Sequence, residues 1–199
     1  MRLRPSDRCD VAVICARLIA HADSRCTAVH ALTVRALAER PAVLCLQFAL
    51  DGELRGLRIA AIGTPVRADE LWRHTCFEAF VRRDGEPGYL EFNFSPSGAW
   101  QAYQFSDYRQ GRLSAELPSP PQLTIGVRES AVRMDEALVL EALVTLPAPY
   151  ADAPRGVQLA VSAVVEDEAG SLSYWALWHA AGRADFHHPD AFTLRLPWS

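Results

Sequence analysis

The feature that most constrains the fold is an alternation of apolar and polar residues, with a period of two, between positions 71 and 109. It is clearest in the run Tyr89-Leu90-Glu91-Phe92-Asn93-Phe94-Ser95. Successive side chains of a β-strand point to opposite faces, so this run predicts a strand with one apolar and one polar face. Glu78, on a predicted strand just before it, joins the polar face if the two strands pair as a hairpin with their polar faces in register. That face is either simply solvated or a ligand-binding surface on which aromatic rings flank carboxylates and an amide.

Short strand-like segments separated by turn residues occur along most of the chain. Further strands are predicted at residues 27–40, 43–50, 57–60, 123–127, 131–134, 137–144, 157–165 and 192–196. Short helical turns are predicted within 67–72 and 147–154. About ten short strands without a long amphipathic helix are typical of a β-sandwich. The predicted fold class is therefore all-β: an antiparallel, jelly-roll-like β-sandwich with one or two short helical turns.

The length of 199 residues and the hydrophobic content of 50% suit one domain with a substantial core. Residues 1 to about 25 have weak periodicity and are predicted to be a short helix or a loose arm. The start of the chain resembles a signal peptide only faintly, because its apolar run is very short and is ended by Arg17.

Charge and cysteine usage indicate the compartment and the partners. The five cysteines, at positions 9, 15, 26, 45 and 76, form no CxxC pair and no zinc-ribbon spacing. Such a pattern is typical of reduced, mostly buried thiols, so we expect a cytoplasmic protein. A net charge of −4 gives no basic surface for nucleic acid. No stretch approaches the roughly 20 apolar residues of a membrane span, and we expect no membrane association.

The composition also excludes several classes of enzyme. All 20 basic residues are arginine, and the chain contains no lysine. Schiff-base chemistry, a pyridoxal-phosphate lysine and a P-loop lysine are therefore excluded. The sequence has no GxSxG elbow, Gly-rich phosphate loop or HExxH motif either.

Two groups of polar residues invite a catalytic or metal interpretation. Glu78 and Glu91 form a glycosidase-like pair if their strands adjoin, since the separation of two carboxyls decides such mechanisms. The histidines His187 and His188 lie near Asp185, but adjacent side chains on an extended segment point in opposite directions. We therefore predict no metal site there, and instead a hydrogen-bonded loop that fastens the last strand.

Several motifs together resemble one family of proteins. They are Trp72-x5-Glu78, the run 89–96, the run Ser173-Tyr174-Trp175-Ala176-Leu177-Trp178-His179 and the run Asp185-Phe186-His187-His188-Pro189-Asp190. With these motifs the chain resembles the DOMON-like bacterial proteins, which are related to family 9 carbohydrate-binding modules. The resemblance covers about residues 18–196 and implies a β-sandwich domain over residues 18–199. Residues 1–17 precede the matching region, and we expect them to be a weakly ordered N-terminal extension.

In the carbohydrate-binding relatives, two tryptophans clasp a sugar ring while charged and amide side chains hold its hydroxyls. The resemblance assigns these roles to Trp72, Trp175 and Glu78. An arginine of the relatives falls near Glu91, so the charge is reversed at that position.

Other DOMON relatives hold haem through a methionine and a histidine. This chain has only Met1 and Met134, which match that pattern poorly. Bis-histidine ligation by His74 or His179 remains an alternative, and we predict no cofactor.

We therefore predict a protein that binds a sugar or sugar-like molecule on an aromatic and carboxylate-lined face, without catalysis. The predicted binding residues are Trp72, Arg73, Glu78, Glu91, Asn93, Tyr174, Trp175 and His179. The alternatives are a glycan-processing hydrolase that uses Glu78 and Glu91, a protein-interaction module and a haem-binding module. The sequence leaves the identity of the ligand and the oligomeric state open.

Overall fold

The computed structural model describes residues 13–40, 42–130, 136–151, 153 and 156–198, and these residues confirm an all-β fold. The strands are β1 (Val13–Ala20), β2 (Val29–Arg40), β3 (Val43–Gly52), β4 (Cys76–Arg83), β5 (Tyr89–Phe94), β6 (Trp100–Phe105), β7 (Leu113–Ser114), β8 (Gln122–Glu129), β9 (Glu136–Thr145), β10 (Val157–Glu166), β11 (Leu172–Ala176) and β12 (Leu194–Leu196). The helical elements are the 3-10 turns η1 (Leu54–Gly56), η2 (Leu71–Arg73) and η3 (Pro189–Ala191) and the short helix α1 (Ala148–Ala151).

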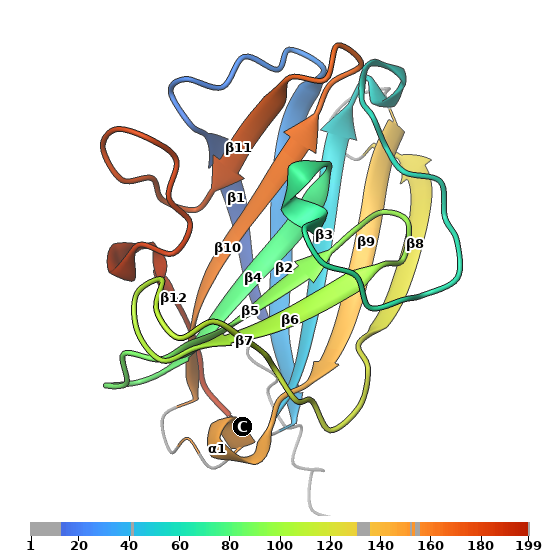
Figure 1. The fold of residues 1–199 in the computed structure, drawn as a ribbon. Coiled ribbons are helices and arrows are strands. Elements are labelled where there is room, and N and C mark those ends of the chain that lie inside the picture. Colours follow the sequence, from blue (N-terminus) through green and yellow to red (C-terminus); the bar gives the residue numbers. More distant parts are fainter. Residues whose placement is uncertain (1–12, 41, 131–135, 152, 154–155, 199) are drawn as a thin grey trace, which may run out of the picture.

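The strands form one antiparallel sheet that curls on itself. Their order is β7-β6-β5-β4-β10-β11-β1-β2-β3-β9-β8, and β12 pairs with β10. The joint is the pairing of β1 with β11, which spans only Ile19 opposite Ala176 and Ala20 opposite Trp175. Beyond this joint the sheet folds over, so that β4, β5 and β6 lie in front of β2, β3 and β9 (Figure 1). The result is a β-sandwich in which the two layers share one edge.

The core lies between the two layers and follows from the alternation along the strands. Leu90, Phe92 and Phe94 of β5 are fully buried in it. Across the sandwich, the rings of Phe48 on β3 and Phe77 on β4 lie 5.0 Å apart between centroids. The apolar face predicted for residues 89–95 is therefore the face that packs against the other layer.

Most of the predicted elements are present, with one correction at residues 57–60 and a second at the start of the described chain. The segment 57–60 is not a strand: Leu57 makes an isolated bridge to Asp167, and the residues after it leave the sheet. The predicted helical turns correspond to η2 and α1. The strand predicted at 131–134 lies outside the described residues.

The start of the described chain differs from the prediction. Residues 13–17 are neither a helix nor a loose arm, because they form the first part of β1 and pair with β2. The domain boundary predicted at residue 18 therefore falls within a strand. Its period was hidden because Val13, Cys15 and Ile19, on the exposed face, are as apolar as the residues that alternate with them. Residues 1–12 lie outside the described part of the chain.

The outer face of the β4–β5–β10 layer is covered by the segment 177–193, which connects β11 to β12. Trp178, Phe186 and Phe192 of this segment pack in a second apolar cluster with Phe80 and Tyr89 of the sheet. This cover turns one end of an otherwise open sheet face into a partly enclosed space. No helix among the described residues is long and apolar enough to cross a membrane.

We expect Phe48→Ala to lower the free energy of unfolding by about 3–5 kcal/mol, because it leaves a cavity between the two layers. Urea denaturation followed by tryptophan fluorescence measures this change. Val127→Ala is the control, since Val127 is exposed on the edge strand β8 and its loss should change the free energy by less than about 0.5 kcal/mol. Equal effects of the two substitutions would contradict the assignment of the core.

Candidate functional site

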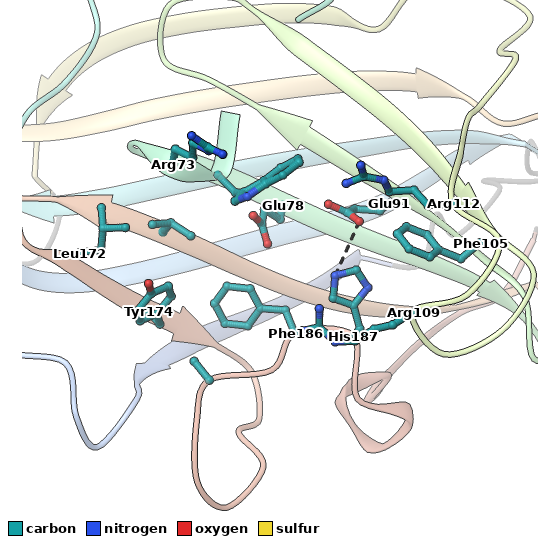
Figure 2. Close-up of a pocket in the computed structure, with 13 residues that line it drawn as sticks. Arg73, Glu78, Glu91, Phe105, Arg109, Arg112, Leu172, Tyr174, Phe186 and His187 are labelled. Atoms are coloured by element: carbon teal, nitrogen blue, oxygen red, sulfur yellow. Dashed lines mark ion pairs between the residues drawn. The ribbon is translucent and has the colours of Figure 1, made fainter. Parts of the chain in front are cut away.

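A cleft of about 500 Å³ opens on the outer face of the layer formed by β4, β5, β10 and β11 (Figure 2). The sheet supplies its floor, while η2, the loop 106–112 and the segment 177–193 supply its walls. The lining residues are Trp72, Arg73, Glu78, Glu91, Phe105, Arg109, Arg112, Val164, Leu172, Tyr174, Ala184, Phe186 and His187.

Two glutamates from neighbouring strands form the polar floor. Glu78 on β4 stands opposite Asn93 of β5, whereas Glu91 stands opposite Phe80, so the two glutamates are diagonal neighbours on one face. The two residues are only 3% and 5% exposed, respectively. Both carboxyls point into the same space, opposite Phe186 and His187 (Figure 2). The shared polar face predicted from the sequence is therefore present.

Neutral donors hold one oxygen of each carboxyl. The Ser162 hydroxyl, on the neighbouring strand β10, donates to Glu78 Oε2 at 2.9 Å. The Asn93 amide donates to Glu91 Oε1 at 2.7 Å. These bonds fix the orientation of the two carboxyls and leave the other oxygen of each directed toward the cleft.

Burial changes the protonation of the floor. Burial, followed by repulsion from Glu91, raises the pKa of Glu78 to about 8. The pKa of Glu91 is also raised by burial, although the hydrogen bond from Asn93 and the charges of Arg112 and Arg109 oppose that rise. At neutral pH Glu78 therefore carries a proton and can donate a hydrogen bond, and Glu91 is the acceptor of the pair.

His187 closes the cleft above Glu91. Its Nδ1 lies 2.8 Å from the Tyr89 hydroxyl, and that hydroxyl accepts the backbone N–H of Arg109 at 3.2 Å. The hydroxyl proton is then free to bond Nδ1, which leaves the ring proton on Nε2, 3.8 Å from Glu91 Oε2. Burial and the charge of Arg109 lower the pKa of His187 to about 4, so the ring is neutral at pH 7.

The loop 106–112 and the segment 177–193 are fastened to each other. Arg109 donates to Asp185 with an N–O distance of 2.7 Å, and the Tyr108 hydroxyl donates to the same carboxylate. With the bond between Tyr89 and His187, these contacts confirm the prediction of a hydrogen-bonded loop that secures the end of the chain. Among the described residues, no group of three or more His, Cys, Asp or Glu side chains is placed to hold a metal.

Aromatic and arginine side chains form the rim. The half-buried rings of Trp72, Tyr174 and Phe186 come from three separate elements and face the cleft. Arg73 is paired with Glu70 at 2.9 Å. The guanidinium of Arg112 lies over the rings of Tyr103 and Trp72, at 5.1 and 5.9 Å from their centroids.

The structure brings together five of the eight residues predicted to bind the ligand. Those that line the cleft are Trp72, Arg73, Glu78, Glu91 and Tyr174. Asn93 is fully buried beneath them and acts on Glu91 rather than on the open space.

Trp175 and His179 are not part of the cleft, so the predicted pair of tryptophans that face each other across it is wrong. Trp175 is 8% exposed and lies in the core of the sandwich, where its indole N–H donates to Ser173 Oγ at 3.0 Å. The reason is that successive side chains of a strand point to opposite faces. Tyr174 faces the cleft, so Trp175 faces the core. His179 lies beside β1, where its Nε2 is 2.9 Å from the carbonyl oxygen of Ile19.

Sequence reasoning missed Phe105, Arg109, Arg112 and Phe186, and it placed His187 in the loop without a role in binding. Phe105 lies in the region of period-two alternation described above, so the alternation could have predicted that its side chain points toward the cleft. The arginines and His187 belong to irregular segments, for which periodicity gives no direction.

Comparison with known proteins gives a match in structure alone. No family model matches the chain, and no curated protein sequence matches it. The fold is similar to that of a proposed carbohydrate-binding protein from Bacteroides uniformis, with a TM-score of 0.61 and 14% identity over 92% of this chain and 84% of that chain. At this identity the likeness concerns the fold, and the resemblance to the DOMON-like family stays a prediction.

We expect the free energy of unfolding to fall as the pH rises from 6.5 to 8. In this range the unfolded chain ionises Glu78, whose ordinary pKa is 4.5, while the folded chain keeps the proton. The slope for one such proton is about 1.4 kcal/mol per pH unit. The lowered pKa of His187 acts in the opposite direction, but only between about pH 4 and 6.5.

Urea denaturation at pH 6.5, 7.25 and 8 measures this dependence. Glu78→Gln should remove most of the pH dependence of the free energy of unfolding, because glutamine has the shape of glutamate but does not ionise. A wild-type protein with the same free energy of unfolding at all three pH values would show that Glu78 is already ionised in the folded state.

Proposed function

We propose that the cleft binds a sugar or sugar-like small molecule and does not convert it. The observation that carries this proposal is the combination, in one space, of aromatic rings at the rim with buried, oriented hydrogen-bonding groups at the floor. A sugar ring has apolar C–H faces and hydroxyls around its edge, so it needs both kinds of group at once. A merely solvated sheet face would have no need to bury two carboxyls.

The floor can satisfy a hydroxyl in both of its roles. Protonated Glu78 donates to a hydroxyl oxygen, and Glu91 accepts a hydroxyl proton, with the charged guanidiniums of Arg109 and Arg112 as further donors. Trp72, half-buried at the edge of the cleft, offers flat apolar area to one face of the ring. The cleft volume of about 500 Å³ falls within the roughly 300–1,000 Å³ that is usual for small-molecule sites.

The likeness in fold to a proposed carbohydrate-binding protein agrees with this proposal. The residues of the cleft, rather than the likeness, carry the chemical argument.

Trp72→Ala should remove sugar binding and leave the melting temperature nearly unchanged, because Trp72 is a half-buried rim residue. Trp175→Ala is the matched comparison, and it should lower the free energy of unfolding by about 3–5 kcal/mol because Trp175 lies in the core. Thermal shift against a panel of monosaccharides and oligosaccharides measures both effects. A ligand at about 100 times its dissociation constant stabilises the fold by roughly 2.7 kcal/mol.

Two results would contradict the proposed site. In the first, no sugar in the panel shifts the melting temperature of the wild-type protein. In the second, Trp72→Ala binds the identified sugar as tightly as the wild type does.

The second candidate function is a hydrolase, and the observation that favours it is the pair of carboxyls on one floor, one of them protonated at neutral pH. Glycosidases place two carboxyls about 5–9.5 Å apart. Diagonal neighbours such as Glu78 and Glu91 lie roughly 7–8 Å apart on their strands, which is compatible with that spacing.

Under the non-catalytic proposal, the wild-type protein releases no reducing sugar or nitrophenol from a panel of glycosides. Release that both Glu78→Gln and Glu91→Gln abolish, with the fold intact by circular dichroism, would establish the hydrolase in its place. Release that persists in both variants would point to a contaminating enzyme.

A further inference from the structure

Among the described residues, no arginine forms an ion pair with either carboxyl of the floor. One oxygen of each is bonded to a neutral group, Ser162 for Glu78 and Asn93 for Glu91. In the described part of the chain, the only basic group within 4.0 Å of either carboxyl is the ring of His187, at 3.8 Å from Glu91. That ring is neutral at pH 7 because its pKa is lowered to about 4.

Buried carboxylates are normally paired with a cation, since an isolated buried charge is costly. Here a proton takes the place of the cation, as the raised pKa of Glu78 indicates. The residue Glu78 is 3% exposed, and one of its carboxyl oxygens accepts no hydrogen bond from any described residue. This oxygen faces the cleft, where a group from outside can reach it (Figure 2).

The arginines of the rim do not fill this role. Arg109 is bound to Asp185 and Arg73 to Glu70. Arg112 lies over two aromatic rings, and its charge lowers the pKa of Glu91 against the larger rise that burial causes. Glu91 is therefore the acceptor, and Glu78 is the group whose proton can be displaced.

The surroundings favour an organic cation over a metal ion. A calcium or magnesium ion takes six or more oxygen ligands, and the described residues offer no group of three or more acidic, histidine or cysteine side chains placed for one. By contrast, the rings of Trp72, Tyr174 and Phe186 line the same cleft. Aromatic faces attract ammonium groups, and the attraction is worth about 0.5–2 kcal/mol.

We propose that the ligand carries an ammonium group that binds between Glu78 and Glu91, so that the preferred ligands of the cleft are amino sugars. This inference rests on the proposed function and narrows its class of ligand. Binding follows a simple balance: the ammonium enters with its charge, Glu78 ionises, and the proton of Glu78 leaves to the solvent. The hydroxyls of the ring remain available to the rim arginines.

The test is titration calorimetry at pH 7 with glucosamine, glucose and N-acetylglucosamine, and with their galacto counterparts. Glucosamine differs from glucose only in its ammonium, and acetylation removes the charge. We expect the ammonium sugar to bind at least about tenfold more tightly than either neutral one. Repeating the titration in two buffers of different ionisation enthalpy should show that a proton is released with the ammonium sugar and that none is released with glucose.

Glu78→Gln should lose the preference for the ammonium sugar, so that glucosamine and glucose then bind with similar affinity. Glu129→Gln, an exposed residue on β8 in the other layer, is the matched control for the loss of one carboxylate and should keep the preference. The proton release is measured on the wild-type protein and does not depend on how well the variant folds.

Each outcome decides between the two proposals. Equal affinity for glucose and glucosamine, without proton release, overturns the inference and leaves the proposed function intact. If tetramethylammonium binds and no sugar does, the ammonium site stands and the sugar function falls. If neither the sugars nor tetramethylammonium bind, both are overturned.

Discussion

The alternation of side chains along β4 and β5 is the constraint on which both the core and the cleft depend. On one face, residues such as Phe77 and Phe92 fill the space between the two layers. On the other, Glu78 and Glu91 reach the cleft from positions that the hairpin register makes diagonal. A slip of one residue would exchange the two faces and drive both carboxyls into the apolar core. The core therefore fixes the face on which the glutamates lie, because burying the aromatic residues of these strands leaves only the outer face for them.

The second requirement is the cover over this face. The segment 177–193 is held by two links to distant parts of the chain: Asp185 to the loop that contains Tyr108 and Arg109, and His187 to Tyr89. Without this cover the floor would be solvated. The rise in the pKa of Glu78 would then lose its main cause, which is burial. The electrostatics of the floor thus depend on contacts made about 80 to 100 residues further along the chain.

The part of the site that the sequence predicted is the part controlled by local periodicity. Glu78 and Glu91 were found because period two gives each side chain a direction, and pairing as a hairpin then brings them together. Trp175 was misplaced because a resemblance between motifs indicates which residue type is present. It does not indicate toward which face of the strand that residue points. Arg109 and His187 were out of reach, since they come from irregular loops whose positions are set by tertiary contacts. β1 was also missed, because its exposed face is largely apolar and the sequence therefore shows no alternation of apolar and polar residues there.

The composition of the floor is hard to explain by packing. Phe80, on the same face of β4 as Glu78, packs against the rings of Tyr89 and His187 at centroid distances of 6.2 and 5.0 Å. An apolar residue at position 78 could extend this cluster without a desolvation penalty, and exchanges of buried ionisable groups for apolar ones are often neutral or stabilising by about 1–4 kcal/mol. Glu78 instead remains almost fully buried with its proton, beside a second carboxyl that raises its pKa further. The pair of buried carboxyls therefore costs stability in the free protein, yet Ser162 and Asn93 orient it by hydrogen bonds. We interpret the pair as one half of an interaction. In our proposal the other half is a ligand, which compensates the buried charge and also fills the cleft.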